Sequence, residues 1–551
     1  MNGGRKNSKQ SNWWTKEMTK LKNELRKARF EDKLWHNEET NRNVKTAKRN
    51  FRKEQRRCVF VYEEKRNINI ENLFNKPSKD DFWKALDGFK RNKDTGISGE
   101  NTKLLQESMK ELFKLNIGKI ENDPIKIEIV EIVKRYEREE KTKLKSSDRQ
   151  YISIESIKKI INELKISNTR GFDGMCNNMI KMVNLELIQH KIRLLINAII
   201  GTGYTPKLLN RSIIIPIIKD KSKKEFDTNN FRPISVSNVF AQILEKVILE
   251  KCSNLLKTSN LQFGFKKQMS TLHPLFLLKE LIHKHIKEET PLYIAFLDSE
   301  KAYDSVWRDG IFFKLIEVIR PQFWLVLKDY YDKSDGILKI NGQFIEEIIE
   351  ITRGVKQGGI LSPQLFNFFI DELIKKISSL GIGCKVKDEN VPIMGFCDDT
   401  ILLATLLKHL SQLVEECEEY SKKWMLKYNI KKSVVLNCGH QIVKDEDIEI
   451  KMDGVNLPVV KASKYLGINI NKENDDDKQI LEKFQKVQKC FYGLGSFGIK
   501  PPGINPKSKA FLFNTFCKPV GTYGIGLMKL KNNTLIYHPK QFNEIHPGYT
   551  V

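Results

Sequence analysis

Two acidic sites, 100 residues apart, constrain the fold of this chain more than any other feature. Asp298 follows a strand-like apolar run at residues 292–297, and the pair Asp398–Asp399 stands between two further apolar runs. An acidic pair between two apolar strands is typical of a hairpin turn, so the pair alone is weak evidence for catalysis. Carboxylates brought together from separate strands of one sheet would make an oxygen-rich site suited to Mg²⁺.

The periodicity of the chain predicts an α+β fold, with strands and helices in separate layers. Residues 1–148 are highly charged and helical in pattern, and residues 149–470 alternate short strand-like and helical runs. Residues 471–551 are lysine-rich and helical again. We therefore predict three domains with these boundaries.

Two strands are predicted ahead of the first acidic site. Residues 213–218 and 231–236 are apolar runs, and the polar residues 227–230 predict a turn before the second. Pro216 lies within the first run. Because proline lacks a backbone N–H, it favours an edge position for this strand.

The charge of the chain predicts a polyanionic partner. Lys and Arg number 95 against 69 Asp and Glu, a net charge of +26. Residues 1–60 hold 18 basic and 7 acidic residues, a net of +11, and those at 42–57 recur at helical spacing. This basic face either contacts nucleic-acid phosphates or is simply solvated, and the sequence leaves both interpretations open.

Several classes of protein do not fit the composition. The longest apolar runs are much shorter than a membrane span, and the N-terminus has no apolar stretch typical of a signal peptide. The nine cysteines include no pair or cluster at zinc-binding spacing. We therefore expect an intracellular protein, in the nucleus or the cytoplasm, with reduced thiols and no membrane partner.

An ordered set of motifs is far more specific than any one of them. The motifs are GFDG at 171–174, IPIIKD at 215–220, NFRPIS at 230–235, QFGF at 262–265, AFLDSEKAYD at 295–304, GVKQGGILSP at 354–363, FCDD at 396–399, NIKKS at 429–433 and YLG at 465–467. In this order they resemble the reverse transcriptase of non-LTR (LINE-type) retrotransposons. The resemblance covers about residues 150–520.

The resemblance implies a right-hand polymerase that copies RNA into DNA. Its expected parts are fingers, a palm made of an antiparallel sheet with helices on one face, and a helical thumb, preceded here by the basic helical extension. The expected partners are an RNA template, a DNA primer or target, and dNTPs. The oligomeric state is not readable from the sequence.

The resemblance also assigns the groups at the reacting phosphates. Asp298 and Asp398 are expected to be the principal ligands of two Mg²⁺ ions, with Mn²⁺ as an alternative metal. Asp399 is expected either to assist them or to orient the primer end. Phosphoryl transfer needs this neutralisation of charge more than it needs covalent catalysis. Lys432 matches the position proposed to protonate pyrophosphate.

Further residues match positions that hold the nucleotide. Lys219 and Arg232 are expected to grip its triphosphate, and Gln357 and Gly358 to contact nucleotide and template. Tyr303, five residues after Asp298, stands at the position of a steric gate against a ribose 2′-hydroxyl. Outside the resemblance, the basic residues would be solvated surface charges, the tyrosine a core aromatic and the glycine part of a plain turn.

The chain departs from the family pattern in two respects. Phe396 and Cys397 stand where Tyr-Ala is commoner, and we expect Cys397 to face the primer side. No endonuclease precedes the motifs, so the chain resembles a truncated element or a polymerase that borrows its primer end. The alternatives are a non-catalytic RNA-binding protein derived from such an element and a splicing maturase, the latter disfavoured because no DNA-binding C-terminal module is recognisable.

Overall fold

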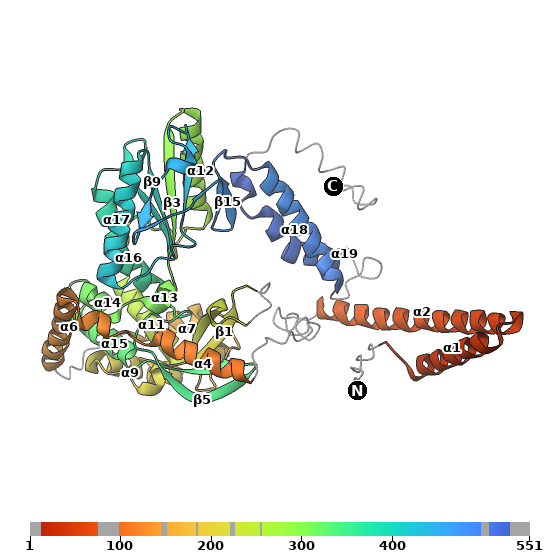
Figure 1. Cartoon of the computed structure of the whole chain (residues 1–551). Coiled ribbons are helices and arrows are strands. Elements are labelled where there is room, and N and C mark those ends of the chain that lie inside the picture. The colour runs from red at the N-terminus through yellow and green to blue at the C-terminus, as the bar shows by residue number, and fades with distance from the viewer. Residues whose placement is uncertain are drawn as a thin grey trace. The chain divides into compact units, whose positions relative to one another are not determined.

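The computed structural model covers all 551 residues, and Figure 1 shows its elements. It describes residues 13–74, 99–144, 151–182, 186–220, 226–253, 256–496 and 506–528. By packing, the chain divides into two compact units, residues 94–475 and residues 1–93 with 476–551. The mixture of helices and sheets agrees with the α+β prediction.

A five-stranded sheet forms the centre of unit 94–475, in the order β13-β10-β3-β9-β8. Its strands are β3 (Pro291–Asp298), β8 (Ile393–Phe396), β9 (Asp399–Ala404), β10 (Val434–Gly439) and β13 (Val459–Val460). β3 is antiparallel to both β9 and β10, and β8 and β9 form a hairpin. The predicted hairpin around the acidic pair is therefore confirmed.

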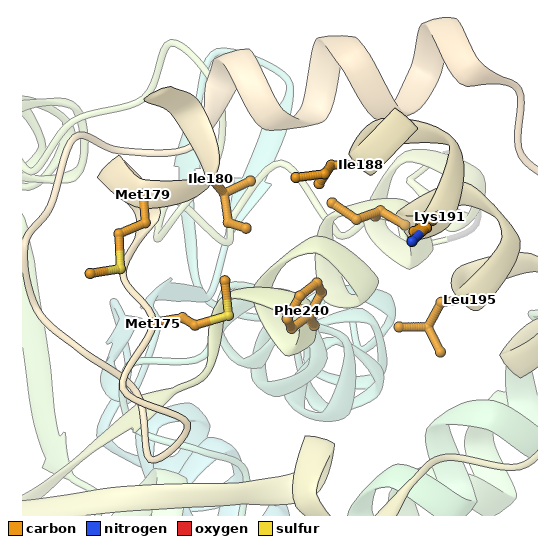
Figure 2. Close-up of a pocket in the computed structure, with 8 residues that line it drawn as sticks. Met175, Met179, Ile180, Ile188, Lys191, Leu195 and Phe240 are labelled. Atoms are coloured by element: carbon orange, nitrogen blue, oxygen red, sulfur yellow. The ribbon is translucent and has the colours of Figure 1, made fainter. Parts of the chain in front are cut away.

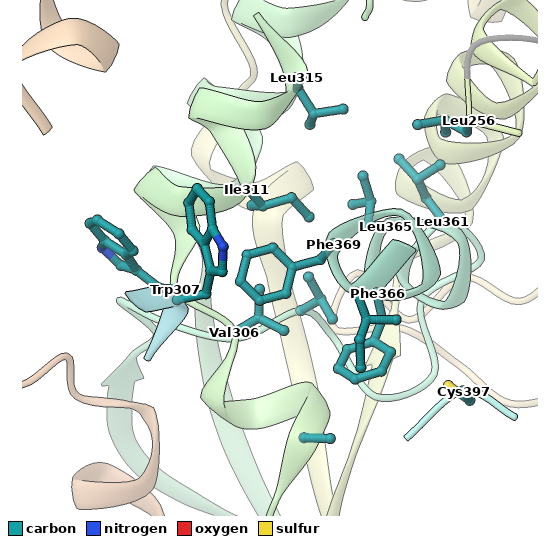
Figure 3. Close-up of a cluster of buried hydrophobic side chains, with 14 of the residues drawn as sticks. Leu256, Val306, Trp307, Ile311, Leu315, Leu361, Leu365, Phe366, Phe369 and Cys397 are labelled. Atoms are coloured by element: carbon teal, nitrogen blue, oxygen red, sulfur yellow. The ribbon is translucent and has the colours of Figure 1, made fainter. Parts of the chain in front are cut away.

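Long helices pack against this sheet. α12 (Leu272–Lys287) and α17 (Leu407–Trp424) contact β3, and α16 (Ser362–Ser379) contacts β8. Figure 3 shows part of the core, where Trp307 and Phe369 pack beside Ile311. Because the interior of β3 is buried along its whole length, its register is well specified, and so is the place of Asp298 at its end.

A four-stranded sheet in the order β2-β1-β4-β5 is the second large sheet of the same unit. Its strands are β1 (Arg211–Ile218), β2 (Phe231–Ser237), β4 (Asp335–Ile340) and β5 (Gln343–Glu350). The predicted edge position of β1 is wrong, since β1 lies between β2 and β4. Pro216 is tolerated there because the ladder with β4 ends at Ile214, so no central pairing needs its N–H.

Shorter elements complete unit 94–475. Its other helices are α4 (Glu100–Phe113), α5 (Gly118–Glu121), α6 (Pro124–Lys143), α7 (Ile154–Glu163), α8 (Asn177–Met182), α9 (Glu186–Thr202), α10 (Lys207–Asn210), α11 (Val239–Cys252), α13 (Ala302–Ser305), α14 (Arg308–Leu315) and α15 (Pro321–Asp332). Its other strands are β6 (Cys384–Val386), β7 (Glu389–Val391), β11 (Lys451–Met452), β12 (Val455–Asn456), β14 (Ala462–Tyr465) and β15 (Ile468–Asn471). Its 3₁₀ turns are η1 (Thr228–Asn230) and η2 (Asp445–Asp447).

The packing boundaries differ from the predicted domain boundaries at 148 and 470. Leu105 and Met109 of α4 lie in one core cluster with β1, β4 and β5, and α6 packs on α14. The helices at 100–143 therefore belong structurally with the sheets. The division into functional domains stays a prediction.

The other unit is helical in its described parts. α1 (Lys16–Trp35) and α2 (Glu38–Phe74) pack as a hairpin, with Met18 and Leu25 buried between them. The C-terminal helices are α18 (Asp477–Ser496), α19 (Pro506–Leu512) and α20 (Lys518–Thr522), with a π-helical turn η3 (Phe513–Cys517) and a 3₁₀ turn η4 (Ile525–Leu527). The predicted helical character of both ends is confirmed within the described residues.

Two expectations about the whole chain can be checked. Among the described residues, no helix combines the length and the apolar character that a membrane crossing requires. All nine cysteines are unpaired, and only Cys490 is not fully buried. This agrees with the prediction of reduced thiols.

Candidate active site

The three predicted carboxylates meet at the end of the five-stranded sheet. Asp298, the last residue of β3, is the register partner of Asp399, the first residue of β9. Asp398 lies in the turn that joins β8 to β9. The backbone of Asp298 is fixed on its other side by Ser433, whose Oγ accepts its N–H at 3.2 Å, and by Asn429, whose N–H donates to its carbonyl at 2.7 Å.

Burial and mutual repulsion make this carboxylate group electrostatically unfavourable on its own. Burial first, then the charges of Asp398 and Asp298, raises the pKa of Asp399 to about 6. The pKa of Asp398 is raised by burial and by Asp298, against the opposing effect of Arg232. Crowded, partly buried carboxylates are the donor chemistry of a hard divalent cation. Within the described part of the chain, however, no group of three or more acidic, His or Cys side chains is already arranged to hold a metal.

Cationic residues from separate elements face this acidic end. Lys432 Nζ lies 3.8 Å from Asp298 Oδ2, and its side chain is 70% exposed. Arg232 of β2 pairs with Ile217 of β1, while the N–H of Lys219 donates to Asn230 O at 2.7 Å. The β1–β2 hairpin therefore places Lys219 and Arg232 together.

The pKa of Lys219 indicates that these cations lie in one region. Burial lowers its pKa first, and the charges of Lys301, Arg232 and Lys432 lower it further, whereas Asp304 opposes them. Four like charges close enough to repel one another are stabilised by a polyanion among them. Of the four, Lys301 was not predicted.

Tyr303 is held on two sides. It lies on the short helix α13, and its ring stacks on Phe366 of α16, with centroids 5.1 Å apart and planes 13° apart. Its hydroxyl contacts Cys397 Sγ at 2.8 Å. Cys397 is 3% exposed, so the expectation that it faces the primer side is not met.

Gln357 and Gly358 lie on a loop that is fixed to its surroundings. Gln357 Nε2 donates to Asp304 Oδ2 at 2.8 Å, and its carbonyl accepts the N–H of Ser235 on β2 at 2.7 Å. Gly358 has a φ of +113°, and a Cβ built there would lie 2.6 Å from Ser235 O. Glycine is therefore required by close approach as well as by backbone conformation.

Three supporting residues were not predicted as site residues. Gln262 is fully buried, and its Oε1 accepts the N–H groups of Cys397 at 2.9 Å and Gly264 at 3.0 Å. Asn367 Nδ2 donates to Gly264 O at 2.6 Å. Asp304 is buried, which raises its pKa to about 7. Gln262 and Asp304 belong to the QFGF and AFLDSEKAYD motifs, so the sequence could have indicated them as site residues. Their contacts could not be predicted, because the partners are far apart in the sequence.

An apolar cavity lies elsewhere in the described part of the chain. It measures about 390 Å³ and is lined mainly by apolar side chains, among them Met175, which precedes α8, Ile188 of α9 and Phe240 of α11 (Figure 2). None of the predicted site residues lines it. The acidic site is instead a convergence of strand ends.

Comparison with protein families indicates which class of protein has this arrangement of carboxylates, cations and a glycine loop. Residues 218–470 match the family model "Reverse transcriptase (RNA-dependent DNA polymerase)". This part of the chain is a reverse transcriptase domain.

The curated relatives of the chain include proteins of mobile elements. The chain is 25% identical over 332 residues to the RNA-directed DNA polymerase from mobile element jockey of Drosophila melanogaster, covering 58% of this chain and 35% of that protein. It is 25% identical over 403 residues to the Pol polyprotein of the type-2 element R2DM from the same species, covering 69% and 36%. The chain is homologous to these polymerases and spans about a third of their length.

One solved structure shows a weak likeness. It is titled as apo telomerase from Candida tropicalis truncated from its C-terminal domain, with 12% identity, a TM-score of 0.33, and coverage of 54% of this chain and 66% of that chain. A likeness this low carries no argument about the fold.

Proposed function

We propose that the chain is an RNA-directed DNA polymerase that extends a primer 3′-hydroxyl with deoxynucleotides during retrotransposition. The observation that carries this proposal is the pairing of Asp298 with Asp399 across β3 and β9, with Asp398 in the adjoining turn. The reverse transcriptase domain and its relatives support the same reaction.

We further propose a right-hand arrangement. The five-stranded sheet would be the palm, since it carries the carboxylates, and the four-stranded sheet with Lys219 and Arg232 would belong to the fingers. Helices α18 to α20 would form the thumb and α1–α2 a basic extension.

The carboxylates have the donor chemistry of a Mg²⁺ or Mn²⁺ site. Asp298 and Asp398 would hold two such ions, with Asp399 beside them, although the side chains are not prearranged as a ligand set. When bound, the ions supply charge neutralisation and activate the 3′-hydroxyl.

The chain's own residues account for the remaining steps. Lys219 and Arg232 bind the triphosphate through their positive charge. The bond between the primer 3′-oxygen and the α-phosphorus forms while the bond to the departing pyrophosphate breaks. Lys432, whose Nζ lies 3.8 Å from Asp298 Oδ2, would give a proton to that pyrophosphate. Tyr303 stands against the sugar, and Gln357 with Gly358 positions base and template.

Template and primer are proposed to bind through charge beyond the site. On α2, Lys45, Arg49, Arg52 and Arg56 are exposed and recur at spacings of four, three and four, so they form one line along the helix. None of the four makes an ion pair with a described residue. An unneutralised basic line fits a phosphate backbone, whose condensed counterions its charges would release.

Primer extension tests the proposed function. The wild-type chain is given poly(rA)·oligo(dT), dTTP and Mg²⁺, and we expect oligo(dT) to lengthen. Binding of the template–primer without extension would instead favour a non-catalytic RNA-binding protein derived from such an element.

A further inference from the structure

The contact between Tyr303 and Cys397 joins two motifs that are 94 residues apart. Their side chains meet at 2.8 Å, between oxygen and sulfur, and either group can donate the proton. The other side of the Tyr303 ring is covered by Phe366. The ring is thus held by one polar contact at its tip and one stacking contact along its face.

Cys397 is itself tightly fixed. Its backbone has a φ of +60°, and its N–H donates to the buried Oε1 of Gln262. Gly264 packs so closely that a Cβ there would lie 2.6 Å from the nitrogen of Cys397. These contacts fix the backbone of Cys397, which carries the thiol, within the same turn as Asp398.

The elements that fix Cys397 and Tyr303 are linked to one another. Asn367, which follows Phe366 on α16, donates a hydrogen bond to the carbonyl of Gly264. A single helix therefore supports both the Tyr303 ring and the loop beside the Cys397 thiol. In Figure 3, Cys397 and Phe366 lie in the same buried cluster. The Tyr303 ring has a defined position before any nucleotide arrives.

We propose that Cys397 is a positioning residue that fixes the Tyr303 ring through its thiol and thereby sets how strongly the site rejects ribonucleotides. This rests on the proposed function. A gate rejects a 2′-hydroxyl only if its ring does not yield, because a shift of about an ångström in a reacting site already changes rates strongly. The short helix α13 leaves the ring dependent on its tertiary contacts.

A plain packing role for Cys397 makes a different prediction. If the side chain only fills space, any smaller residue should act through stability alone. If the hydrogen bond matters, serine should substitute for cysteine and alanine should not, because a serine hydroxyl can still reach the tyrosine hydroxyl.

The test compares kcat/KM for dTTP with that for UTP on poly(rA)·oligo(dT). We expect Cys397→Ala and Tyr303→Phe each to reduce the dTTP/UTP ratio about tenfold, and the double variant to reduce it no further, because both remove one interaction. Cys397→Ser should keep the ratio within about twofold of wild type. Cys438→Ala removes another fully buried thiol from the same sheet and should leave the ratio unchanged.

Each outcome decides the question, because the ratio does not depend on the fraction of folded enzyme. An unchanged ratio in Cys397→Ala or Tyr303→Phe overturns the inference, as does an equal loss in Cys397→Ser and Cys397→Ala. If Cys397→Ala does not fold, Tyr303→Phe and Cys397→Ser still decide. A wild-type chain that extends no primer would overturn the proposed function itself, which is a distinct result.

Discussion

Replacing Gly358 with alanine should separate the two demands that the structure makes on this residue. Its φ of +113° strains any residue with a Cβ, and that Cβ would also lie 2.6 Å from Ser235 O, a backbone atom of β2. The same strand is bound to the loop by the hydrogen bond from Ser235 N–H to Gln357 O. Alanine must therefore push the loop away from β2.

The magnitude follows from a matched control. Gly342, in the turn between β4 and β5, has a φ of +85° and nothing within 4 Å of a built Cβ. Gly342→Ala should therefore cost only the backbone strain, about 1–2 kcal/mol. Gly358→Ala adds a displaced strand and a weakened hydrogen bond, so we expect a loss of about 3–4 kcal/mol in the free energy of unfolding.

Urea denaturation followed by circular dichroism measures both losses on the same chain. The KM for dTTP, measured by primer extension, should rise in Gly358→Ala and stay near wild type in Gly342→Ala. Equal losses of stability in the two variants would refute the reasoning, because the contact with Ser235 would then contribute nothing.

Two further predictions concern the site, and a third concerns the basic line on α2. Burial raises the pKa of Asp304 from its ordinary 3.8 to about 7, so the native state holds the proton more tightly than the unfolded state does. The free energy of unfolding should therefore fall as pH rises from about 4 to 7. In thermal unfolding, Asp304→Asn should be more stable than wild type at pH 8, by at most about 4 kcal/mol, and equal to it near pH 4. Tyr303→Val should raise UTP incorporation relative to dTTP, and an unchanged ratio of kcat/KM would make Tyr303 a core aromatic. The slope of log K against log salt for RNA binding should flatten by up to about 0.7 per lost contact when Lys45, Arg49, Arg52 and Arg56 are changed to glutamine. The control is the same change at Lys16, Lys20, Arg26 and Arg29, which do not share one line. Equal slopes in the two variants would favour a merely solvated face.

The local features of the fold could be predicted from the sequence. Apolar runs and polar turns gave β3, the β1–β2 pair and the β8–β9 hairpin, because burial of successive residues leaves a direct pattern. The motifs then identified which strand ends carry chemistry. The roles of the predicted site residues stay predictions until they are tested.

Neighbours across the fold could not be predicted in this way. Besides β2, β1 pairs with β4, where Arg211 and its register partner Asp335 are 124 residues apart in the sequence. The central position of β1 therefore could not be predicted. Cys397 contacts Gln262 and Tyr303, which are 135 and 94 residues away in the sequence. Periodicity shows that a side chain is buried but does not show against what it packs.

The most direct measurement of the central claim is the initial rate of dTMP incorporation on poly(rA)·oligo(dT) with Mg²⁺ by wild type, Asp298→Ala and Asp398→Ala. Asp453→Ala, an exposed aspartate in the β11–β12 turn, is the matched control. We predict that each active-site variant loses at least about a thousandfold in rate, since each removes a metal ligand from the transition state, while the control keeps the wild-type rate. Extension by Asp298→Ala or Asp398→Ala at the wild-type rate would contradict the account.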